Sequence, residues 1–302
     1  MEFKNLKELM TYLKDEKVCL DYYALLRWDG NPVCAHCHSP KPYLLKNGKY
    51  RCSSKDCRKD FSVTKGTIFE KSKISLATWM GAVFVLSGHK KGISSLQLAR
   101  DLGVTQKTAW FMNHRIRHIM GDPNPEPLDN IVEIDETYVG GTFANMNRKR
   151  RKEWQDSGKD NKIGVMGLLE RDGNAKLTVI GANTFKDVVR QNVDKTATVV
   201  TDTHLSYVGL AQEYAGHLSV NHSQSEYRRG IAYTNSVEGF FSCLKRSIFG
   251  IYHSVSPKHL QRYCEETSYR YNTRKITDKD RFISTLQQTE GRLTYKKLVN
   301  KP

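Results

Sequence analysis

The 302-residue sequence lacks a hydrophobic run long enough to cross a membrane. Its longest uncharged apolar stretch, LATWMGAVFVLSG at residues 76–88, suits a buried helix and is too short to span a bilayer. The first twenty residues, MEFKNLKELMTYLKDEKVCL, carry charges throughout and have no apolar core of the kind found in secretory signal peptides. We therefore expect a cytoplasmic location.

Acidic residues are in short supply relative to basic ones. There are 32 Asp and Glu against 48 Lys and Arg, which gives a formal net charge of +16. This excess favours a polyanionic partner, and nucleic acid over a membrane, because no amphipathic basic helix stands out as an anchor. Hydrophobic residues make up 38% of the chain, which argues against a disordered protein, and the length has room for two or three domains.

Cysteines are few and unevenly distributed. Four of the seven lie between residues 34 and 57. An odd count without a secretion signal favours a reducing compartment, where clustered thiolates bind metal instead of forming disulfides.

The clustered cysteines form two pairs. VCAHC contains a C-x2-C pair and CSSKDC a C-x4-C pair, with the hairpin dipeptide Asn47-Gly48 between them. Four thiolates suit a tetrahedral structural Zn²⁺ and leave no open position for catalysis. We predict a zinc ribbon in a first domain, residues 1–70. The predicted ligands are Cys34, Cys37, Cys52 and Cys57.

The segment GISSLQLARDLGVTQKTAWFMNHRIRHIM, residues 92–120, has the pattern of a helix-turn-helix. A tight turn is predicted at Leu102-Gly103-Val104, and Thr105 can cap the second helix. We expect that helix to enter a DNA major groove within a domain at 71–122, although an ordinary helical hairpin fits the pattern too. Its predicted outer face carries Gln106, Lys107, His114, Arg115 and Arg117.

The linker GDPNPEPLDN, residues 121–130, contains three prolines and precedes a third domain at 123–302. Strands and helices alternate there, which predicts an α/β fold with a mixed sheet and flanking helices. A basic insertion around Trp154 is expected to be a loop, either solvated or gripping phosphates. The predicted strands are 131–135, 162–170, 175–182, 197–202 and 217–222, and the predicted helices are 184–193, 206–214 and 235–248.

Two of the predicted buried strands end in aspartate, at Asp135 and Asp202. The carboxyl ends of such strands border the crevice where α/β sheets bind ligands. Two carboxylates side by side repel each other unless a divalent cation lies between them. A site built of carboxylates suits Mg²⁺ or Mn²⁺ and phosphoryl transfer by two metal ions.

A third ligand is expected from the helix TNSVEGFFSCLKR, residues 234–246. At 3.6 residues per turn, Asn235, Glu238 and Lys245 share its polar face. Glu238 is the preferred ligand because a carboxylate supplies charge that an amide does not. Asn235, one turn earlier, is the second choice or a neighbouring ligand.

The motifs EIDETYVGG, VVTDTHLSY, TNSVEGFFSCLKR and GIYHSVSPKHLQRYCEETSYRYNTR together resemble the DDE transposases of bacterial insertion sequences. The resemblance is strongest to the group related to Merlin elements, in which a zinc ribbon precedes an RNase H-like catalytic domain. It implies a metal-dependent, nucleoid-associated enzyme that binds the terminal inverted repeats of a mobile DNA element, cuts there and transfers the strand to target DNA. It also implies a homodimer or larger oligomer that brings two ends together.

The resemblance implies roles for individual residues. Asp135, Asp202 and Glu238 match the catalytic acids. Lys245, with the neighbouring Arg246, matches the position of a phosphate contact, and His253 lies in the family pattern that follows. Two rival functions are another RNase H-like endonuclease or resolvase, and a catalytically inactive DNA-binding regulator derived from a transposase. The presence of all three acids and the lysine favours the active enzyme.

Overall fold

The computed structural model describes residues 3–122, 125–140, 148–149, 151–152, 162–181, 184–204, 207–221, 224, 226 and 228–300. Trp154 and most of the basic insertion around it lie outside these ranges. The chain divides into two compact units: unit 1 is Met1–Met120 with Lys275–Pro302, and unit 2 is Gly121–Arg274.

The carboxyl-terminal segment belongs to unit 1, whereas the sequence placed it in a domain spanning 123–302. The physical reason is apolar burial. Phe282, in helix α10 (Asp278–Gln287), is fully buried, and its ring packs against those of Phe3 and Phe84 at centroid distances of 5.6 and 5.8 Å. The predicted domain end is therefore wrong at this point.

Helices make up most of unit 1. Helix α3 (Leu76–Gly88) is the apolar stretch noted in the sequence, and most of its residues are buried. None of the helices in the described part of the chain is both long and apolar enough to cross a bilayer. The other helices of this unit that appear below or in the figures are α1 (Leu6–Tyr12), α2 (Glu16–Trp28) and α11 (Tyr295–Val299).

A small antiparallel sheet carries the cysteine cluster. Its strands are β1 (Tyr43–Leu44), β2 (Tyr50–Arg51) and β3 (Asp60–Phe61), in the order β1-β2-β3. The predicted hairpin is confirmed, and Gly48 turns it with a φ of 75° that favours glycine.

Two helices joined by a tight turn follow α3. Helix α4 (Ser95–Leu102) ends at Gly103, which is left-handed with a φ of 64°, and α5 (Gln106–Met120) begins shortly after it. The Thr105 hydroxyl accepts from the backbone N–H of Thr108 at 3.2 Å, so the predicted cap is confirmed.

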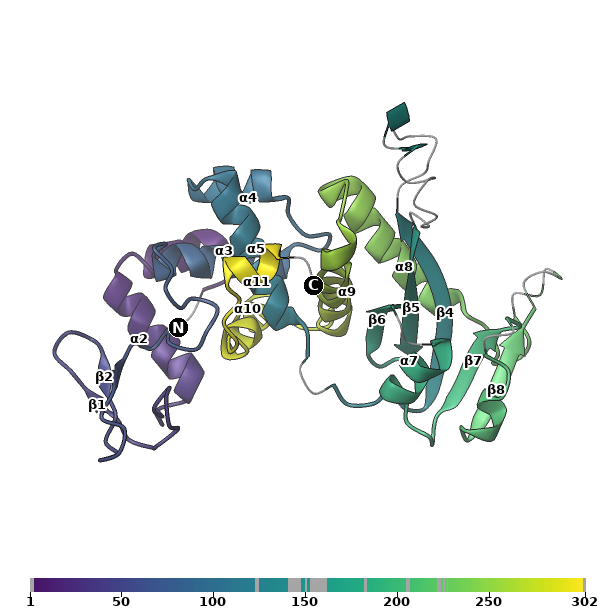
Figure 1. Cartoon of the computed structure of the whole chain (residues 1–302), viewed down its shortest axis with the longest axis horizontal. Coiled ribbons are helices and arrows are strands. Elements are labelled where there is room, and N and C mark those ends of the chain that lie inside the picture. Colours follow the sequence, from purple (N-terminus) through teal and green to yellow (C-terminus); the bar gives the residue numbers. More distant parts are fainter. Residues whose placement is uncertain are drawn as a thin grey trace. The chain divides into compact units, whose positions relative to one another are not determined.

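Unit 2 contains a five-stranded mixed sheet in the order β6-β5-β4-β7-β8 (Figure 1). The first three strands pair antiparallel, and β4, β7 and β8 pair parallel. The predicted RNase H-like mixed sheet is confirmed. The strands are β4 (Ile131–Gly140), β5 (Lys162–Glu170), β6 (Ala175–Val179), β7 (Thr198–Asp202) and β8 (Gly216–Val220).

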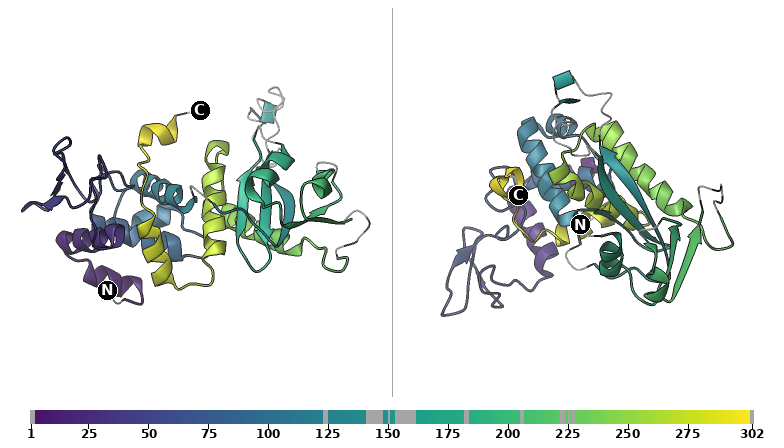
Figure 2. Two further views of the ribbon diagram at one scale, coloured as in Figure 1. Left: turned by 90° about the horizontal axis from the view of Figure 1, so that it is seen from below. Right: turned by 45° about the vertical axis from the view of Figure 1, so that its right-hand side comes forward.

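Helices cover both faces of this sheet. Helix α7 (Phe185–Asn192) packs on one face, and α8 (Asn235–Ser247) and α9 (Leu260–Asn272) pack on the other (Figures 1 and 2). Successive β4 side chains point to opposite faces of the sheet, as in any β-strand. Val132 and Ile134 join the core beneath α7, and Val139 joins the core beneath α8.

The helix predicted at 206–214 is wrong. The described part of that range, 207–214, has 3-10 and turn residues, including η3 (Leu210–Gln212), and no α-helix. Gly209 precedes η3 in the left-handed region with a φ of 95°, which is incompatible with a continuous α-helix. Helix α8 runs directly into a π-helix, η5 (Ile248–Tyr252).

Candidate active site

Asp135 and Asp202 lie on adjacent parallel strands, β4 and β7. Strand β4 pairs with β7 at Ile131↔Thr198, Val132↔Val199 and Glu133↔Val200. The parallel pairing ends at Glu133↔Val200, two residues before each aspartate. By the alternation of strand side chains, both carboxylates lie on the α8 face of the sheet, and the charge of Asp202 contributes to raising the pKa of Asp135.

Helix α8 packs directly over this part of the sheet. Asp135 pairs across the antiparallel ladder with Gly167 of β5. A Cβ atom at Gly167 would lie 2.7 Å from side-chain atoms of Phe241 and Val237, both on the buried face of α8. The missing side chain therefore allows α8 to approach the sheet beside Asp135.

The Asp135 carboxyl group is partly buried among other acids. Burial raises its pKa to about 7, and the nearby carboxylates of Glu136, Asp202 and Glu238 act in the same direction. The backbone N–H of Glu136 donates to its Oδ1 at 2.8 Å and opposes the shift. Asp202 Oδ1 in turn accepts from the backbone N–H of His204 at 2.9 Å. A concentration of carboxylates of this kind is a donor set that fits Mg²⁺ or Mn²⁺.

The polar face of α8 is turned to solvent. Asn235, Glu238 and Lys245 are exposed, whereas the opposite face, with Phe241 and Leu244, is buried. The hydroxyl of Thr234 lies 3.4 Å from Glu238 Oε1 and donates to it. Both candidate third ligands therefore stand at the start of α8 on accessible positions, and the choice between them stays open.

The candidate DNA contacts that follow Glu238 are also exposed. Lys245 lies two turns after Glu238, and Arg246 is within 3.5 Å of Cys243 Sγ through Nη2. His253 ends the π-helix η5 with a φ of 57°, and its Nδ1 is 3.1 Å from the carbonyl oxygen of Phe249.

The predicted basic face of α5 is wrong for three of its residues. His114, Arg115 and Arg117 are 0%, 5% and 1% exposed, so they do not form an outer face. The guanidinium of Arg115 donates to the carbonyl oxygens of Ile68, Glu70 and Leu293.

The amino-terminal turn of α5 is exposed, unlike the buried part of the helix with His114, Arg115 and Arg117. Gln106 and Lys107 are exposed, and the Lys107 ammonium lies 5.3 Å from the centre of the Tyr295 ring. The carboxyl-terminal segment with Leu293 and Tyr295 packs beside α5, which explains why the sequence of the helix alone misled the prediction.

The four predicted zinc ligands converge. Their sulfur atoms all lie within 4.8 Å of one another, with Cys37 and Cys52 at 3.4 Å and Cys34 and Cys57 at 3.9 Å. A tetrahedral site with Zn–S bonds of about 2.3 Å requires sulfur separations of roughly 3.8 Å. Donation from the Ser39 hydroxyl and N–H lowers the pKa of Cys37 to about 6. The prediction of a structural zinc site is supported, and no other group of three or more His, Cys, Asp or Glu in the described ranges comes this close.

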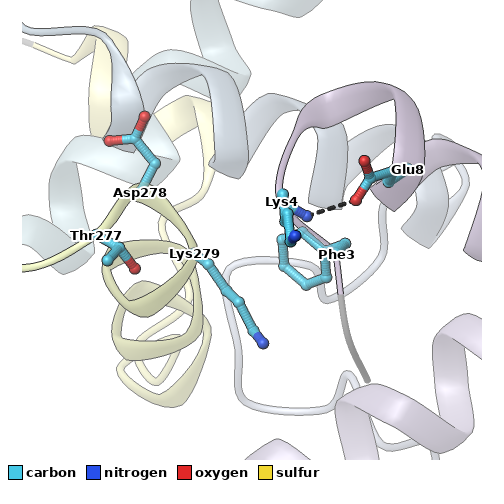
Figure 3. A pocket seen from close by; sticks show the side chains of 6 residues that line it. All are labelled: Phe3, Lys4, Glu8, Thr277, Asp278 and Lys279. Carbon is cyan, nitrogen blue, oxygen red and sulfur yellow. Dashed lines mark hydrogen bonds between the residues drawn. The ribbon is translucent and has the colours of Figure 1, made fainter.

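One open hollow lies in unit 1. It is lined by Phe3, Lys4, Glu8 and the start of α10 at residues 277–279 (Figure 3). On its α1 side, the backbone N–H of Lys4 donates to Glu8 Oε2 at 2.7 Å. None of the site residues predicted from the sequence lines this hollow.

Two acids near the site were not singled out by sequence reasoning. Glu136 accepts from the Tyr207 hydroxyl at 2.7 Å, on the α7 side of the sheet. Glu133 is fully buried in β4 and contacts the start of α8. The signal for Glu133 was present, because it is an acid inside an otherwise apolar run, just before Asp135.

These features define the class of the domain. A mixed sheet carries Asp135 within β4 and Asp202 at the end of the adjacent parallel strand β7, on the face covered by α8. This is an RNase H-like domain with a carboxylate site.

Comparison with known families narrows the class. Residues 127–272 match the ISXO2-like transposase domain, and residues 14–60 match the transposase zinc-ribbon domain. The chain therefore carries a transposase zinc ribbon followed by an ISXO2-like transposase domain, and the resemblance to the transposases of insertion sequences is confirmed.

A similar protein from Halobacterium salinarum is also linked to a transposable element. It is an uncharacterized protein in the transposable element ISH50, 27% identical over 248 residues that cover 76% of this chain and 82% of the relative. The similarity extends across most of both proteins.

Proposed function

We propose that this chain is an active DDE transposase, which binds the ends of a mobile DNA element and catalyses strand cleavage and transfer to target DNA. One observation carries the proposal: Asp135 and Asp202 lie on adjacent parallel strands, beside a helix that presents Asn235 and Glu238. The membership of residues 127–272 in a transposase family supports the same reaction.

In this proposal Asp135, Asp202 and Glu238 hold Mg²⁺ or Mn²⁺, with Asn235 as the alternative or an additional ligand. When bound there, such ions would activate the attacking oxygen and stabilise the leaving oxygen of an in-line phosphoryl transfer. The carboxylates of Asp135, Asp202 and Glu238 supply negative charge at a partly buried position. Without a cation between them, burial and mutual repulsion raise the pKa of Asp135.

DNA contacts are proposed at the exposed basic residues. Lys245 and Arg246 follow the catalytic face of α8, and His253 follows the π-helix, so they are placed to hold the backbone next to the reacting phosphate. Lys107, on the first turn of α5, is proposed to contact terminal-repeat DNA together with the zinc ribbon. Arg115 and Arg117 are excluded because they are buried.

A joining assay tests the reaction. Full-length protein is given a labelled duplex that ends in a precut 3′-hydroxyl, a target plasmid and Mn²⁺. A transposase yields joined product. A resolvase or repair endonuclease yields only cleavage, and an inactive regulator yields only bound DNA.

Point variants then identify the ligands. Asp202→Asn should abolish joining and leave end binding intact. Glu238→Gln should do the same if Glu238 is the third ligand, whereas near-normal joining by Glu238→Gln together with loss in Asn235→Ala assigns that role to Asn235. Glu213→Gln is the matched control, since Glu213 pairs with Arg190 on the surface of the same unit at 2.7 Å.

Because two element ends must be joined, we also propose that a dimer or larger oligomer assembles on DNA. Light scattering of the protein with and without end DNA measures this directly. A one-to-one complex that still joins ends would contradict it.

A further inference from the structure

Glu133 connects the central strand to the first turn of α8. Its carboxylate is 0% exposed. Oε2 accepts from the backbone N–H groups of Ser236 at 2.9 Å and Val237 at 3.1 Å, and Oε1 lies 3.0 Å from the Ser236 hydroxyl, which donates to it. Three donors at the beginning of one helix therefore converge on a side chain from β4.

Helix α8 has no cap from its own N-cap residue. Thr234 occupies that position, but its side chain makes no capping hydrogen bond. The first N–H groups of a helix have no partner within the helix, and the positive end of the helix dipole favours an anion there. Glu133 supplies both the acceptors and the charge that this helix end requires.

Arg171 holds the same helix end from the other side. Its Nε lies 2.8 Å from Glu133 Oε1, and its Nη atoms donate to the carbonyl oxygens of Ile231 at 2.8 Å and Tyr233 at 3.0 Å. The guanidinium also lies 3.6 Å from the centre of the Tyr233 ring. The chain entering α8 is thus fixed by an arginine that is itself paired with Glu133.

The contacts of Glu133 with the first turn of α8, called the anchor below, start two residues along β4 from Asp135 of the candidate metal site. Glu133 and Asp135 are alternate residues of β4, so they face the same side of the sheet at a spacing of about 6.7 Å. Asn235 immediately precedes the anchored N–H groups, and Glu238 immediately follows them. Any movement of the anchored turn would shift both candidate ligands relative to Asp135.

We propose that Glu133 is a positioning residue: it fixes the first turn of α8 so that Asn235 and Glu238 stand beside Asp135 and Asp202. This inference rests on the proposed function, since it concerns the assembly of the same metal site. Glu133 contacts neither metal nor DNA in this role. It acts through the backbone of Ser236 and Val237.

The test measures Mn²⁺ affinity of the full-length, zinc-loaded protein, by calorimetry and by the electron paramagnetic resonance signal of the bound ion. Glu133→Gln keeps the shape but turns an amide donor towards Arg171 or the helix N–H groups. Loss of a residue that orients metal ligands weakens metal binding roughly 10- to 100-fold, and that is the expected result. Binding to end DNA in the absence of Mn²⁺ should be unchanged.

A matched control separates positioning from the mere loss of a buried ion pair. Glu266 is 1% exposed and pairs with Arg270 at 2.6 Å in the same unit, but it lies on α9 and not at the start of α8. Glu266→Gln should lower the melting temperature and leave Mn²⁺ affinity near wild type. Equal losses of Mn²⁺ affinity in both variants would overturn the proposal.

A charge reversal sharpens the result. The double variant Glu133→Arg with Arg171→Glu retains an ion pair but directs a cation at the helix N–H groups. We expect the Mn²⁺ affinity of this double variant to stay below that of the wild type. Recovery to the wild-type value would show that only the pair matters, and would overturn the positioning role.

Ser236→Ala keeps the proposal testable if Glu133→Gln does not fold. It removes one donor to Glu133, and a loss of roughly 2- to 10-fold in Mn²⁺ affinity is expected from one hydrogen bond. Wild-type affinity in Ser236→Ala would then count against the anchor. Wild-type protein that binds no Mn²⁺ would instead remove the proposed metal site itself, an outcome distinct from failure of the anchor alone.

Discussion

The two candidate metal sites of this chain are built in opposite ways. The zinc site takes four thiolates from one short stretch, Cys34 to Cys57, and brings their sulfur atoms within 4.8 Å. The acidic site takes its side chains from β4, β7 and α8, which lie far apart in the sequence, and its acids do not converge to that distance among the described residues. One site is local and tightly packed, and the other is assembled by the register of a sheet and the placement of a helix.

The difference reflects what each metal would do. A structural Zn²⁺ with four thiolates stabilises the loop that binds it, because its binding free energy is also folding free energy. A site for Mg²⁺ or Mn²⁺ must accept DNA oxygens as further ligands, so open and partly solvated carboxylates are expected there. Variants that act on one site should leave the other intact.

Removal of zinc should have the largest effect. Structural zinc in small modules contributes about 10–16 kcal/mol of apparent binding free energy, so Cys52→Ser should unfold the ribbon. Limited proteolysis and zinc analysis measure the loss, and binding to end DNA should weaken with it. Cys243→Ser is the control, because Cys243 is an exposed cysteine outside the cluster and its loss should leave the zinc content unchanged. Undiminished DNA binding after verified zinc loss would make the ribbon dispensable.

Gly167→Ala should disturb the acidic site without touching zinc. The added Cβ would lie 2.7 Å from Phe241 and Val237, and overpacking of a core typically destabilises by about 1–3 kcal/mol. We expect a lower melting temperature and loss of joining, because α8 must move away from Asp135. Gly239→Ala, within α8 but with nothing within 4 Å of the new Cβ, should be tolerated. Normal joining by Gly167→Ala would contradict the close approach.

Asp135→Asn should change the pH dependence of stability in protein that holds zinc but no Mg²⁺ or Mn²⁺. The folded pKa of Asp135 is raised to about 7, above the unfolded value of about 3.9. Its contribution to stability is therefore full below about pH 4, falls as the pH rises, and is gone above about pH 7. Asp135→Asn should remove this dependence and melt a few degrees above wild type at pH 8, and added Mg²⁺ should narrow the gap. A lower melting temperature for the variant at pH 8 would contradict the shift.

Lys107→Ala should give the smallest effect. Loss of one phosphate contact weakens DNA binding about uniformly across sequences and lowers the salt slope by about 1. Arg115→Ala is the informative contrast, because Arg115 is buried and donates to three backbone carbonyls. It should lower the melting temperature of unit 1 and leave the salt slope of the folded protein unchanged. If Arg115→Ala lowered the salt dependence of DNA binding and Lys107→Ala did not, then Arg115 and not Lys107 would be the phosphate contact.

Local patterns in the sequence predicted local structure well. The spacing of the cysteines identified the ribbon, and the helix predicted at 184–193 is present as α7, which Thr184 caps in a capping box with Asp187. The buried and exposed faces of α8 also followed from helical periodicity, since the contrast between its apolar and polar residues is strong.

Features that depend on distant parts of the chain were not predictable in the same way. The burial of Arg115 depends on a segment near the other end of the chain, at Leu293, which no periodicity within α5 reveals. The role of Glu133 depends on which helix end lies over β4. Asp135 and Asp202 were found because both were predicted strand ends. Strand β7 does end at Asp202, whereas β4 continues past Asp135 to Gly140, so that predicted end is wrong.

The discontinuity of unit 1 has a consequence for biosynthesis. Its core includes Phe282, Leu286 and Leu293, which are separated from Met120 by the whole of unit 2, Gly121–Arg274. At the usual pace of translation, a ribosome needs roughly 8–30 s to synthesise that interval. The unit that carries the zinc ribbon can therefore complete its core only after the unit with the acidic site has been made.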